Sequence, residues 1–182
     1  MSYTSISLRH LTRCPHDLLL TKLHRHGISG TALRWFARYL SNRQQRVVLE
    51  GAFSDWLNVT SGVPQGSILE PLLFLVFANE MPSYVQHGSS LALFADDSKL
   101  YRPIASVSSL ALLQSDLDGL HSWSFDRRVT FNTTKCKVLH RSKRRSRRKP
   151  LNTYHLGEEV LSHSPEPQIG RASCRERVCQ YV

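Results

Sequence analysis

The sequence predicts a single α+β domain in which amphipathic helices alternate with short pairs of strands. Apolar residues recur at helical spacing in residues 69–77 and 107–123. Short apolar runs bounded by glycine, asparagine or aspartate lie between the helices and are typical of strands joined by turns. The 182 residues, 41% of them apolar and 21% charged, suffice for one globular domain with a hydrophobic core.

The first third of the chain predicts two helices and a strand pair. One helix begins at His16 and Asp17 and ends at Gly27, since Asp favours a helix start and Gly a helix end. A second helix begins near Thr31 and stops at residues 41–43. Strands follow at residues 45–49 and 53–59, separated by a turn at Gly51. One face of the second helix carries Leu33, Phe36 and Leu40.

The middle of the chain predicts a buried helix, a strand pair and an amphipathic helix. The helix at residues 69–77 is apolar on all sides, so we expect it to lie deep in the core. Residues 90–101 indicate two strands joined by a tight turn at residues 95–97. The helix at residues 107–123 presents a leucine stripe to the core, formed by Leu110, Leu113, Leu117 and Leu120.

The remaining elements are short. Residues 129–131 and 137–140 predict two strands, and residues 154–161 predict a hairpin around Gly157. Residues 141–149 hold seven basic side chains in nine. They have no interleaved aromatic residues, which argues against base stacking. Phosphate contact, nuclear targeting or a solvated loop all remain open for this run.

Charge and composition limit the class of protein. The net charge of +10, from 24 basic and 14 acidic residues, favours a polyanionic partner, nucleic acid before a membrane surface, although a solvated basic surface would give the same balance. No apolar run approaches the length of a membrane span, and the N-terminus lacks the pattern of a secretory signal. The four cysteines lack zinc-site spacing and do not resemble a disulfide framework, so we expect a reducing intracellular compartment.

Two adjacent carboxylates, Asp96 and Asp97, follow the apolar strand that ends at Phe94. A tight turn can present both side chains towards one cleft, where carboxylates without partners would be costly to hold. Mg²⁺ suits such a pair, since it binds a few carboxylates together with substrate phosphates. Two such ions can catalyse phosphoryl transfer. An ordinary surface turn is the alternative, because Asp is a common turn residue.

The loop at residues 61–67, Ser-Gly-Val-Pro-Gln-Gly-Ser, precedes the buried helix. Gly66 permits close approach of a ligand, and Gln65 can hydrogen-bond a base or sugar. Ser67 can cap the helix, and free amide groups at the helix start would suit a phosphate. An ordinary helix-entry loop is the alternative.

Together these segments resemble the reverse transcriptases of non-LTR (LINE-type) retrotransposons, from about Pro15 to about Leu161. The resemblance rests on an ordered series of motifs, not on one of them. The series is Pro15–Leu19, Trp35–Phe36, Tyr39–Arg43, Gln45–Val47, Phe53–Trp56, Ser61–Ser67, Pro71–Phe74, Phe94–Asp97, Leu117–Trp123, Phe131–Asn132 and Lys135–Cys136.

The resemblance implies part of the fingers and palm of a polymerase, with a catalytic β-hairpin and flanking helices. In it Asp96 and Asp97 correspond to catalytic acids that bind Mg²⁺, or alternatively Mn²⁺, and Lys135 to a lysine linked to proton delivery. The implied partners are an RNA template, a DNA primer and deoxynucleotides, with no membrane and with protein partners undetermined. The positions that would contact nucleotide and template are Gly62, Pro64, Gln65, Gly66, Ser67, Phe94 and Ala95.

The chain departs from the family at two places. The family's first catalytic strand has roughly the sequence Asp-Phe-Ser-Lys-Ala-Phe-Asp, and its first Asp aligns with Ile6. We therefore expect residues 1–14 to replace that strand, and Ile6 to stand where an acid should face Asp96 and Asp97. The second departure is Glu70, where the family has Gly.

These observations give the expected organisation and function. Residues 15–161 form a partial reverse transcriptase domain, residues 162–168 stay unassigned, and residues 169–182 resemble a translated sequencing adapter, so we exclude them. The expected function is an RNA-directed DNA polymerase fragment that is inactive because the first catalytic Asp is missing. A non-catalytic, basic nucleic-acid-binding remnant is the alternative. We expect an intracellular location, in the nucleus if the chain reaches chromosomal DNA.

Overall fold

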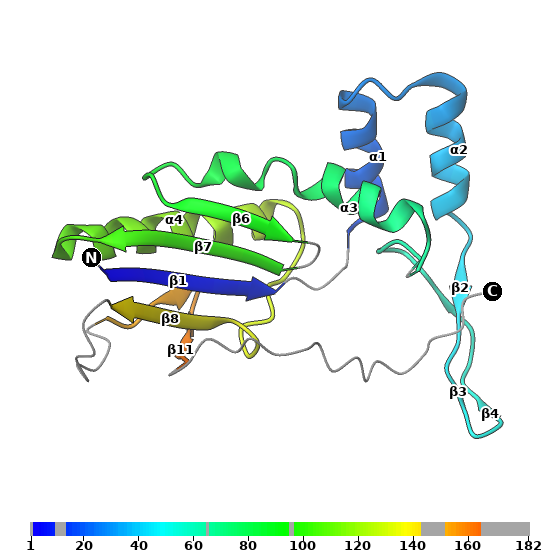
Figure 1. The fold of residues 1–182 in the computed structure, drawn as a ribbon. Helices are drawn as coiled ribbons and strands as arrows, with labels where there is room; N and C mark the ends of the chain where they lie inside the picture. Colours follow the sequence, from blue (N-terminus) through cyan, green and yellow to red (C-terminus); the bar gives the residue numbers. More distant parts are fainter. Residues whose placement is uncertain (1, 10–13, 65, 95–96, 143–151, 165–182) are drawn as a thin grey trace. The chain divides into compact units, whose positions relative to one another are not determined.

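The computed structural model describes residues 2–9, 14–64, 66–94, 97–142 and 152–164 (Figure 1). The chain divides into two compact units. The sheet unit contains the described residues within 2–9 and 78–164, and the helical unit contains those within 14–77. Helices and small sheets alternate along the chain, as the sequence predicts for an α+β protein.

A five-stranded sheet forms the frame of the sheet unit, in the order β11-β8-β1-β7-β6 (Figure 1). Strand β1 lies in the centre and pairs antiparallel with both β7 and β8. Strand β6 pairs antiparallel with β7, and β11 pairs parallel with β8. The strands are β1 (Ser2–Arg9), β6 (Ser90–Phe94), β7 (Asp97–Ile104), β8 (Lys137–Ser142) and β11 (Ser162–His163).

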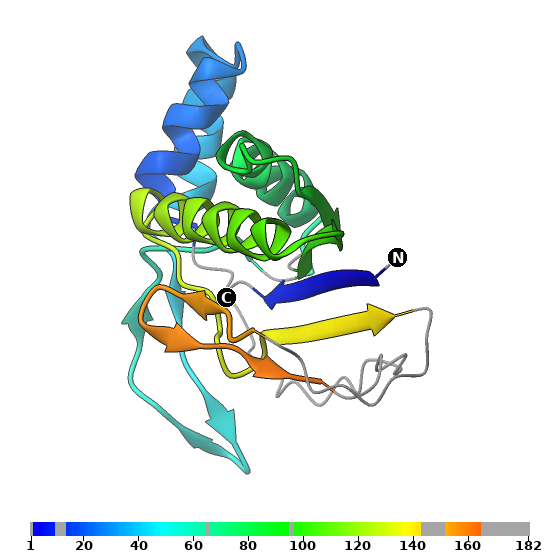
Figure 2. The same cartoon turned by 90° about the vertical axis from the view of Figure 1, so that its left-hand side faces the viewer.

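Helix α4 (Val107–Asp126) covers one face of this sheet (Figure 2). Its first turn is held by a capping box between Ser106 and Ser109. The predicted leucine stripe is confirmed as a core face, since Leu113, Leu117 and Leu120 have no exposed surface. Their burial from water is the main favourable term that holds helix and sheet together.

The strand register separates a helix-covered face of the sheet from an exposed face. Ile6 pairs with Leu100 on β7 and with Val138 on β8, and all three side chains are fully buried. Paired residues share a face, and neighbours along a strand point to opposite faces. Asp97 and Lys99 therefore lie on the exposed face.

Shorter elements complete the sheet unit. The 3-10 helix η1 (Met81–Tyr84) packs against α4 so closely that a Cβ added at Gly119 would overlap the Tyr84 carbonyl oxygen. That contact explains a glycine in the middle of a helix, where it is otherwise unfavourable. The predicted hairpin around Gly157 is confirmed, with strands β9 (His155–Leu156) and β10 (Glu159–Val160).

A buried carboxylate fastens the loop before β6 to α4. Asp116 has no exposed surface and accepts hydrogen bonds from the amides of His87 (2.7 Å) and Ser89 (3.0 Å). The Arg102 guanidinium lies 3.6 Å from its second oxygen. Burial by itself would raise the pKa of Asp116, but the hydrogen bonds from Ser89 and His87 outweigh it and lower the pKa.

The helical unit begins with α1 (His16–Arg25) and α2 (Gly30–Leu40), close to the predicted ranges. The expected strand pair after them forms two separate short ladders instead of one hairpin. Strand β2 (Gln44–Gln45) pairs with β5 (Leu57–Asn58), and β3 (Val48–Leu49) pairs with β4 (Ala52–Phe53) around the predicted turn at Gly51. Helix α3 (Leu69–Ala78) ends the unit.

Some expectations about the fold are wrong. Helix α3 does not lie deep in the core on all sides: Leu73 and Phe77 are buried, but Leu72 and Leu75 are 57% and 58% exposed. Composition alone does not decide how many sides of an apolar helix find partners. Residues 129–131 form no strand, since the chain turns back over the end of α4 there.

Two strands were not expected. The sequence predicts no element in residues 162–168, yet Ser162–His163 forms β11. The N-terminal segment, treated as a replacement for a family strand, forms the central strand of the sheet. None of the described helices is long and apolar enough to span a membrane. Most of the basic run at residues 141–149, and the excluded tail, lie outside the described residues.

We predict that Asp116→Asn lowers the free energy of unfolding at pH 7 by about 2 kcal/mol or more, because it removes the charge that binds two amides and Arg102. The folded-state pKa of Asp116 is lowered, so its contribution is present above the ordinary Asp pKa and is lost as the pH falls through the lowered value. The free energies of unfolding of the parent chain and of Asp116→Asn, measured by urea denaturation, should therefore differ less at acidic pH than at pH 7. Asp118→Asn, on an exposed position of the same helix, is the control. An equal effect of both substitutions would contradict the prediction.

Candidate functional site

The predicted strand, turn and strand at residues 90–101 is present in the sheet unit. Phe94, the last residue of β6, pairs with Asp97, the first residue of β7. Ala95 and Asp96 lie between them and are outside the described residues. Asp97 is half-buried, whereas the Phe94 side chain is 83% exposed. The strand ends thus bring one of the two predicted acids to an edge of the sheet.

Basic residues share the sheet face and the sheet edge of Asp97. Lys99 follows two residues later on β7, and Lys137 lies on the same face at the start of β8; both are exposed. Lys135 is exposed in the turn before β8, held by a hydrogen bond from its amide to the Asn132 carbonyl (3.0 Å). Because β7 and β8 both run antiparallel to β1, their first residues meet at the same edge of the sheet. Asp97 and Lys135 therefore lie at one edge, two strands apart.

Strand β1 brings no acid to this edge. Its last residue, Arg9, is the register partner of Asp97. Ile6 aligns with the family's catalytic Asp. It lies three residues before Arg9, and its side chain is on the helix-covered face with Leu100. Ile6 and Asp97 thus lie on opposite faces of the sheet, because neighbouring positions along a strand point to opposite sides, and Asp96 is outside the described residues.

The described side chains do not make a metal centre with Asp97. In the part of the chain that the structure describes, no three of His, Cys, Asp and Glu gather at one point. The register partner of Asp97 on β1 is Arg9. Of the two predicted acids, the described residues include Asp97 and not Asp96, so they contain only part of the expected metal site.

The loop at residues 61–67 belongs to the helical unit and is fixed to the start of α1. Gly62 has a positive φ of 84°, its amide donates to the Cys14 carbonyl (2.8 Å), and its own carbonyl accepts from His16 (2.8 Å). Cys14 is buried, and its burial raises the pKa of the thiol to about 12 although Lys22 opposes the shift. Pro64 and Ser67 are half-buried, and Gln65 is outside the described residues.

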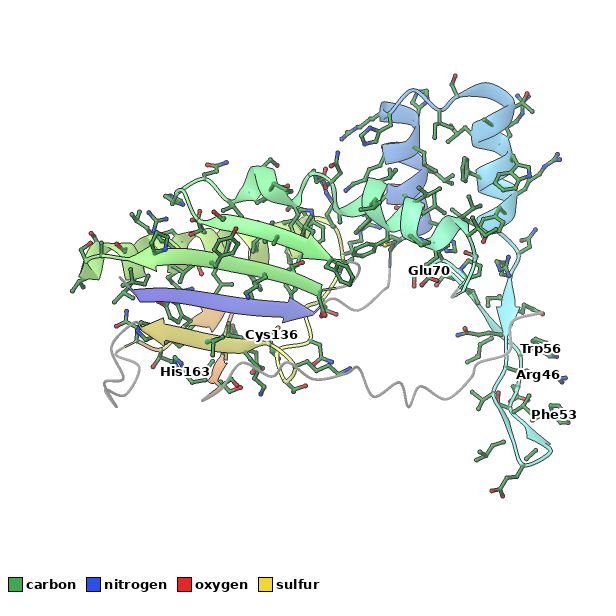
Figure 3. The ribbon with its side chains drawn as sticks, viewed as in Figure 1. Arg46, Phe53, Trp56, Glu70, Cys136 and His163 are labelled. Carbon is green, nitrogen blue, oxygen red and sulfur yellow. The ribbon has the colours of Figure 1, made fainter. Side chains whose placement is uncertain are left out.

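The end of this loop is closed by a cap of the α3 helix. The Ser67 hydroxyl accepts a hydrogen bond from the Glu70 amide (3.2 Å), so the predicted capping role of Ser67 is confirmed. The Glu70 carboxylate accepts from the Gly66 amide at 2.7 Å (Figure 3). The expectation of free amides for a phosphate is therefore wrong for Gly66 and Glu70. The spacing Ser-x-x-Glu, typical of a capping box, was the signal for this contact.

Arginine and aromatic side chains gather on the strands that follow α2. The Arg46 guanidinium lies 4.2 Å from the ring centre of Phe53 and 4.6 Å from that of Trp56 (Figure 3). The two rings are 60% and 43% exposed. On α2, Trp35 stacks on Tyr39 with ring centres 5.5 Å apart. We call Arg46, Phe53 and Trp56 the arginine–aromatic cluster; sequence spacing did not indicate it, because the three residues come together only through strand pairing.

Known proteins with similar sequences come from mobile genetic elements. The chain is 31% identical over 105 residues, 54% of its length, to the RNA-directed DNA polymerase from mobile element jockey of Drosophila melanogaster. It is 44% identical over 62 residues, 32% of its length, to the probable RNA-directed DNA polymerase from transposon X-element of the same species. The chain spans only 12% and 7% of these two relatives.

The match to a protein family covers more of the chain than either relative does. Residues 12–165 match the family described as reverse transcriptase (RNA-dependent DNA polymerase). The matched range includes the loop at residues 61–67, the strands around Asp97 and the turn at Lys135. By this match the chain belongs to the reverse transcriptase family.

Proposed function

We propose that this chain is part of the fingers and palm of a retrotransposon reverse transcriptase, with β6 and β7 as its catalytic hairpin, and that it does not transfer nucleotides itself. The position of Asp97 supports the hairpin assignment: β6 and β7 pair antiparallel, and Asp97 stands half-buried at the start of β7, on the sheet face opposite to Leu100. The substrates of the complete enzyme would be an RNA template, a DNA primer and deoxynucleotides, with Mg²⁺ as cofactor. Access to chromosomal DNA would place it in the nucleus.

The exposed sheet face suits a nucleic acid backbone. Lys99 and Lys137 flank the edge that carries Asp97, and Lys135 lies in the turn beside it. Lysines at such positions neutralise phosphates without reading base sequence. Phe94, largely exposed at the same edge, offers a ring to a sugar or base. In the complete enzyme, the positions of Asp96 and Asp97 would bind the metal ions, and the position of Lys135 would assist proton delivery.

The proposed inactivity rests on the absence of an acidic residue from β1. Transfer by two metal ions requires carboxylates that neutralise both ions. Strand β1 holds no Asp or Glu, and its residue at the level of Asp97 is Arg9. We therefore propose that the acids at residues 96 and 97 stand without the carboxylate that completes such a site.

Nucleic-acid binding without catalysis is the second candidate function, and the arginine–aromatic cluster favours it. Stacking of bases on exposed rings and a neighbouring guanidinium is the usual mode of single-strand binding. Phe53 and Trp56 expose their rings beside Arg46. Such a surface needs no metal ion and no acid, so it would keep its affinity when the catalytic site is incomplete.

In a template–primer extension assay with Mg²⁺ and deoxynucleotides, we expect no incorporation above background, because the site lacks an acid on β1. An active reverse transcriptase serves as the positive control. Robust incorporation by this chain that disappears in Asp96→Ala or Asp97→Asn would overturn the proposed inactivity.

Binding of a single-stranded oligonucleotide, followed by quenching of tryptophan fluorescence, should be independent of Mg²⁺. We expect Arg46→Ala and Trp56→Ala each to weaken binding by roughly five- to tenfold, since stacking contributes about 1–3 kcal/mol per base. Arg34→Ala, which removes one exposed positive charge from α2, is the matched control and should weaken binding less. If all three variants bind alike, the arginine–aromatic cluster is not the binding surface.

The cap at Glu70 should stabilise the helical unit. Glu70→Ala removes the acceptor of the Gly66 amide, so we expect the free energy of unfolding to fall by about 1 kcal/mol. Chemical denaturation followed by circular dichroism measures the change. Asp55→Ala, at an exposed position of the same unit, is the control, and a stability of Glu70→Ala equal to that of the control would rule out the cap.

A further inference from the structure

Strand β1 is the central strand of the sheet, but its residues are not those of a catalytic strand. It pairs along its whole length with β7, yet its Ile6 side chain lies in the core and the register partner of Asp97 is Arg9. Residues 6–12, Ile-Ser-Leu-Arg-His-Leu-Thr, match the family pattern Asp-Phe-Ser-Lys-Ala-Phe-Asp at no position. From Pro15 onward the family motifs return in order. A sharp boundary of this kind points to one event that altered a whole segment, not to separate substitutions.

The genetic code offers a test of that idea. A codon read one nucleotide early consists of the last nucleotide of one codon and the first two of the next. An aspartate can arise in this way only where the chain has Ile, Met or Thr, and a phenylalanine only at Phe, Leu or Ser. A lysine requires Lys, Asn, Ser or Arg, and an alanine requires Leu, Pro, His, Gln or Arg. A serine requires Leu, Pro, His, Gln, Arg, Val or Ala.

All seven residues satisfy these conditions. Ile6 and Thr12 stand where the two aspartates would arise, and Ser7 and Leu11 stand where the two phenylalanines would arise. The remaining three positions, for serine, lysine and alanine, hold Leu8, Arg9 and His10.

A single nucleotide string encodes both sequences. The codons TCG ATT TCT CTA AGG CAT TTG ACN translate to residues 5–12 of this chain. From the third nucleotide the same string is GAT TTC TCT AAG GCA TTT GAC, which translates to Asp-Phe-Ser-Lys-Ala-Phe-Asp. The first of these aspartates overlaps the Ile6 codon, the same position that the spacing from Pro15 assigns to it.

We propose that residues 6–12 are an out-of-frame translation of the first catalytic strand, whose two aspartates remain encoded at this locus. One surplus nucleotide between the codons of Thr12 and Pro15 accounts for the return to the family frame. Pro15 has a CCN codon, so a TGC codon at Cys14, one of the two cysteine codons, would form a run of cytosines at that point. The inference rests on the proposed function, because it assigns β1 to the place of a catalytic strand.

The structure adds a consequence for repair of the site. In the present register position 6 lies fully buried with Leu100 and Val138, so an aspartate there would be placed in the core. A slip of one residue moves every side chain of a strand to the opposite face. The acid would reach the exposed face only if β1 took a different register, which the whole in-frame segment would have to specify.

Sequencing of the genomic DNA and the transcript tests the proposal directly, whether or not any variant is active. The third nucleotides of the codons for residues 5–11 should be G, T, T, A, G, T and G, and related copies in the same genome should lack the surplus nucleotide. Third nucleotides that agree no better than ordinary codon usage would overturn the proposal. Agreement at these positions would stand even if the proposed polymerase function fails.

Two protein variants test whether the in-frame segment fits the position of β1 in this sheet. Ile6→Asp should lower the urea midpoint, because it buries a carboxylate beside Leu100. Replacement of residues 6–12 by Asp-Phe-Ser-Lys-Ala-Phe-Asp should unfold at a higher urea concentration than Ile6→Asp. If the segment replacement is less stable than Ile6→Asp, the in-frame strand does not belong in this sheet and the structural part of the proposal fails.

Discussion

The packing of α4 on one face of the sheet determines which side chains of the strands are buried and which face solvent. Leu113, Leu117 and Leu120 bury their side chains together with Leu100 on β7. That contact commits one face of each strand to the core, and the alternation of side chains then commits the other face to solvent. On that other face Lys99 is exposed and Asp97 is half-buried, whereas Ser98 and Leu100 are buried on the core face. The candidate site is thus a consequence of apolar burial on the opposite side of the same strand.

The same burial of one face explains why β1 fits the sheet although it lacks an acidic side chain. A central strand is held mainly by backbone hydrogen bonds, which most sequences can form, and by one apolar face. Ile6 supplies that face, and the strand therefore fits the sheet although its residues differ from those of the family. Pairing in the sheet preserves architecture but not catalytic chemistry, because chemistry depends on which side chain stands at the level of Asp97. A strand translated out of frame can meet the first requirement and fail the second.

In the helical unit, the protein's own side chains bind backbone amides that could otherwise bind a ligand. A helix start has amide donors that can hold an anion or be satisfied by the protein's own side chains. Here Ser67 and Glu70 satisfy two of them, and the family's Gly would have left the Gly66 amide without this acceptor. The arginine–aromatic cluster, by contrast, keeps two large rings in solvent. Any binding that this unit retains should therefore depend more on stacking than on phosphate capture.

The sequence by itself determined the features that depend on local periodicity and local motif. It predicted the leucine stripe of α4, the strands on both sides of residues 95–96, the cap at Ser67 and membership of the reverse transcriptase family. Those signals lie within a few turns or a few strand residues, so they need no knowledge of distant partners. Tertiary structure alone decided the rest. It placed β1 in the middle of the sheet, turned Ile6 to the core, set Arg9 opposite Asp97 and gathered Arg46, Phe53 and Trp56. Each of these depends on register or on contacts between segments far apart in the chain, and a one-residue change of register reverses the face of every side chain in a strand.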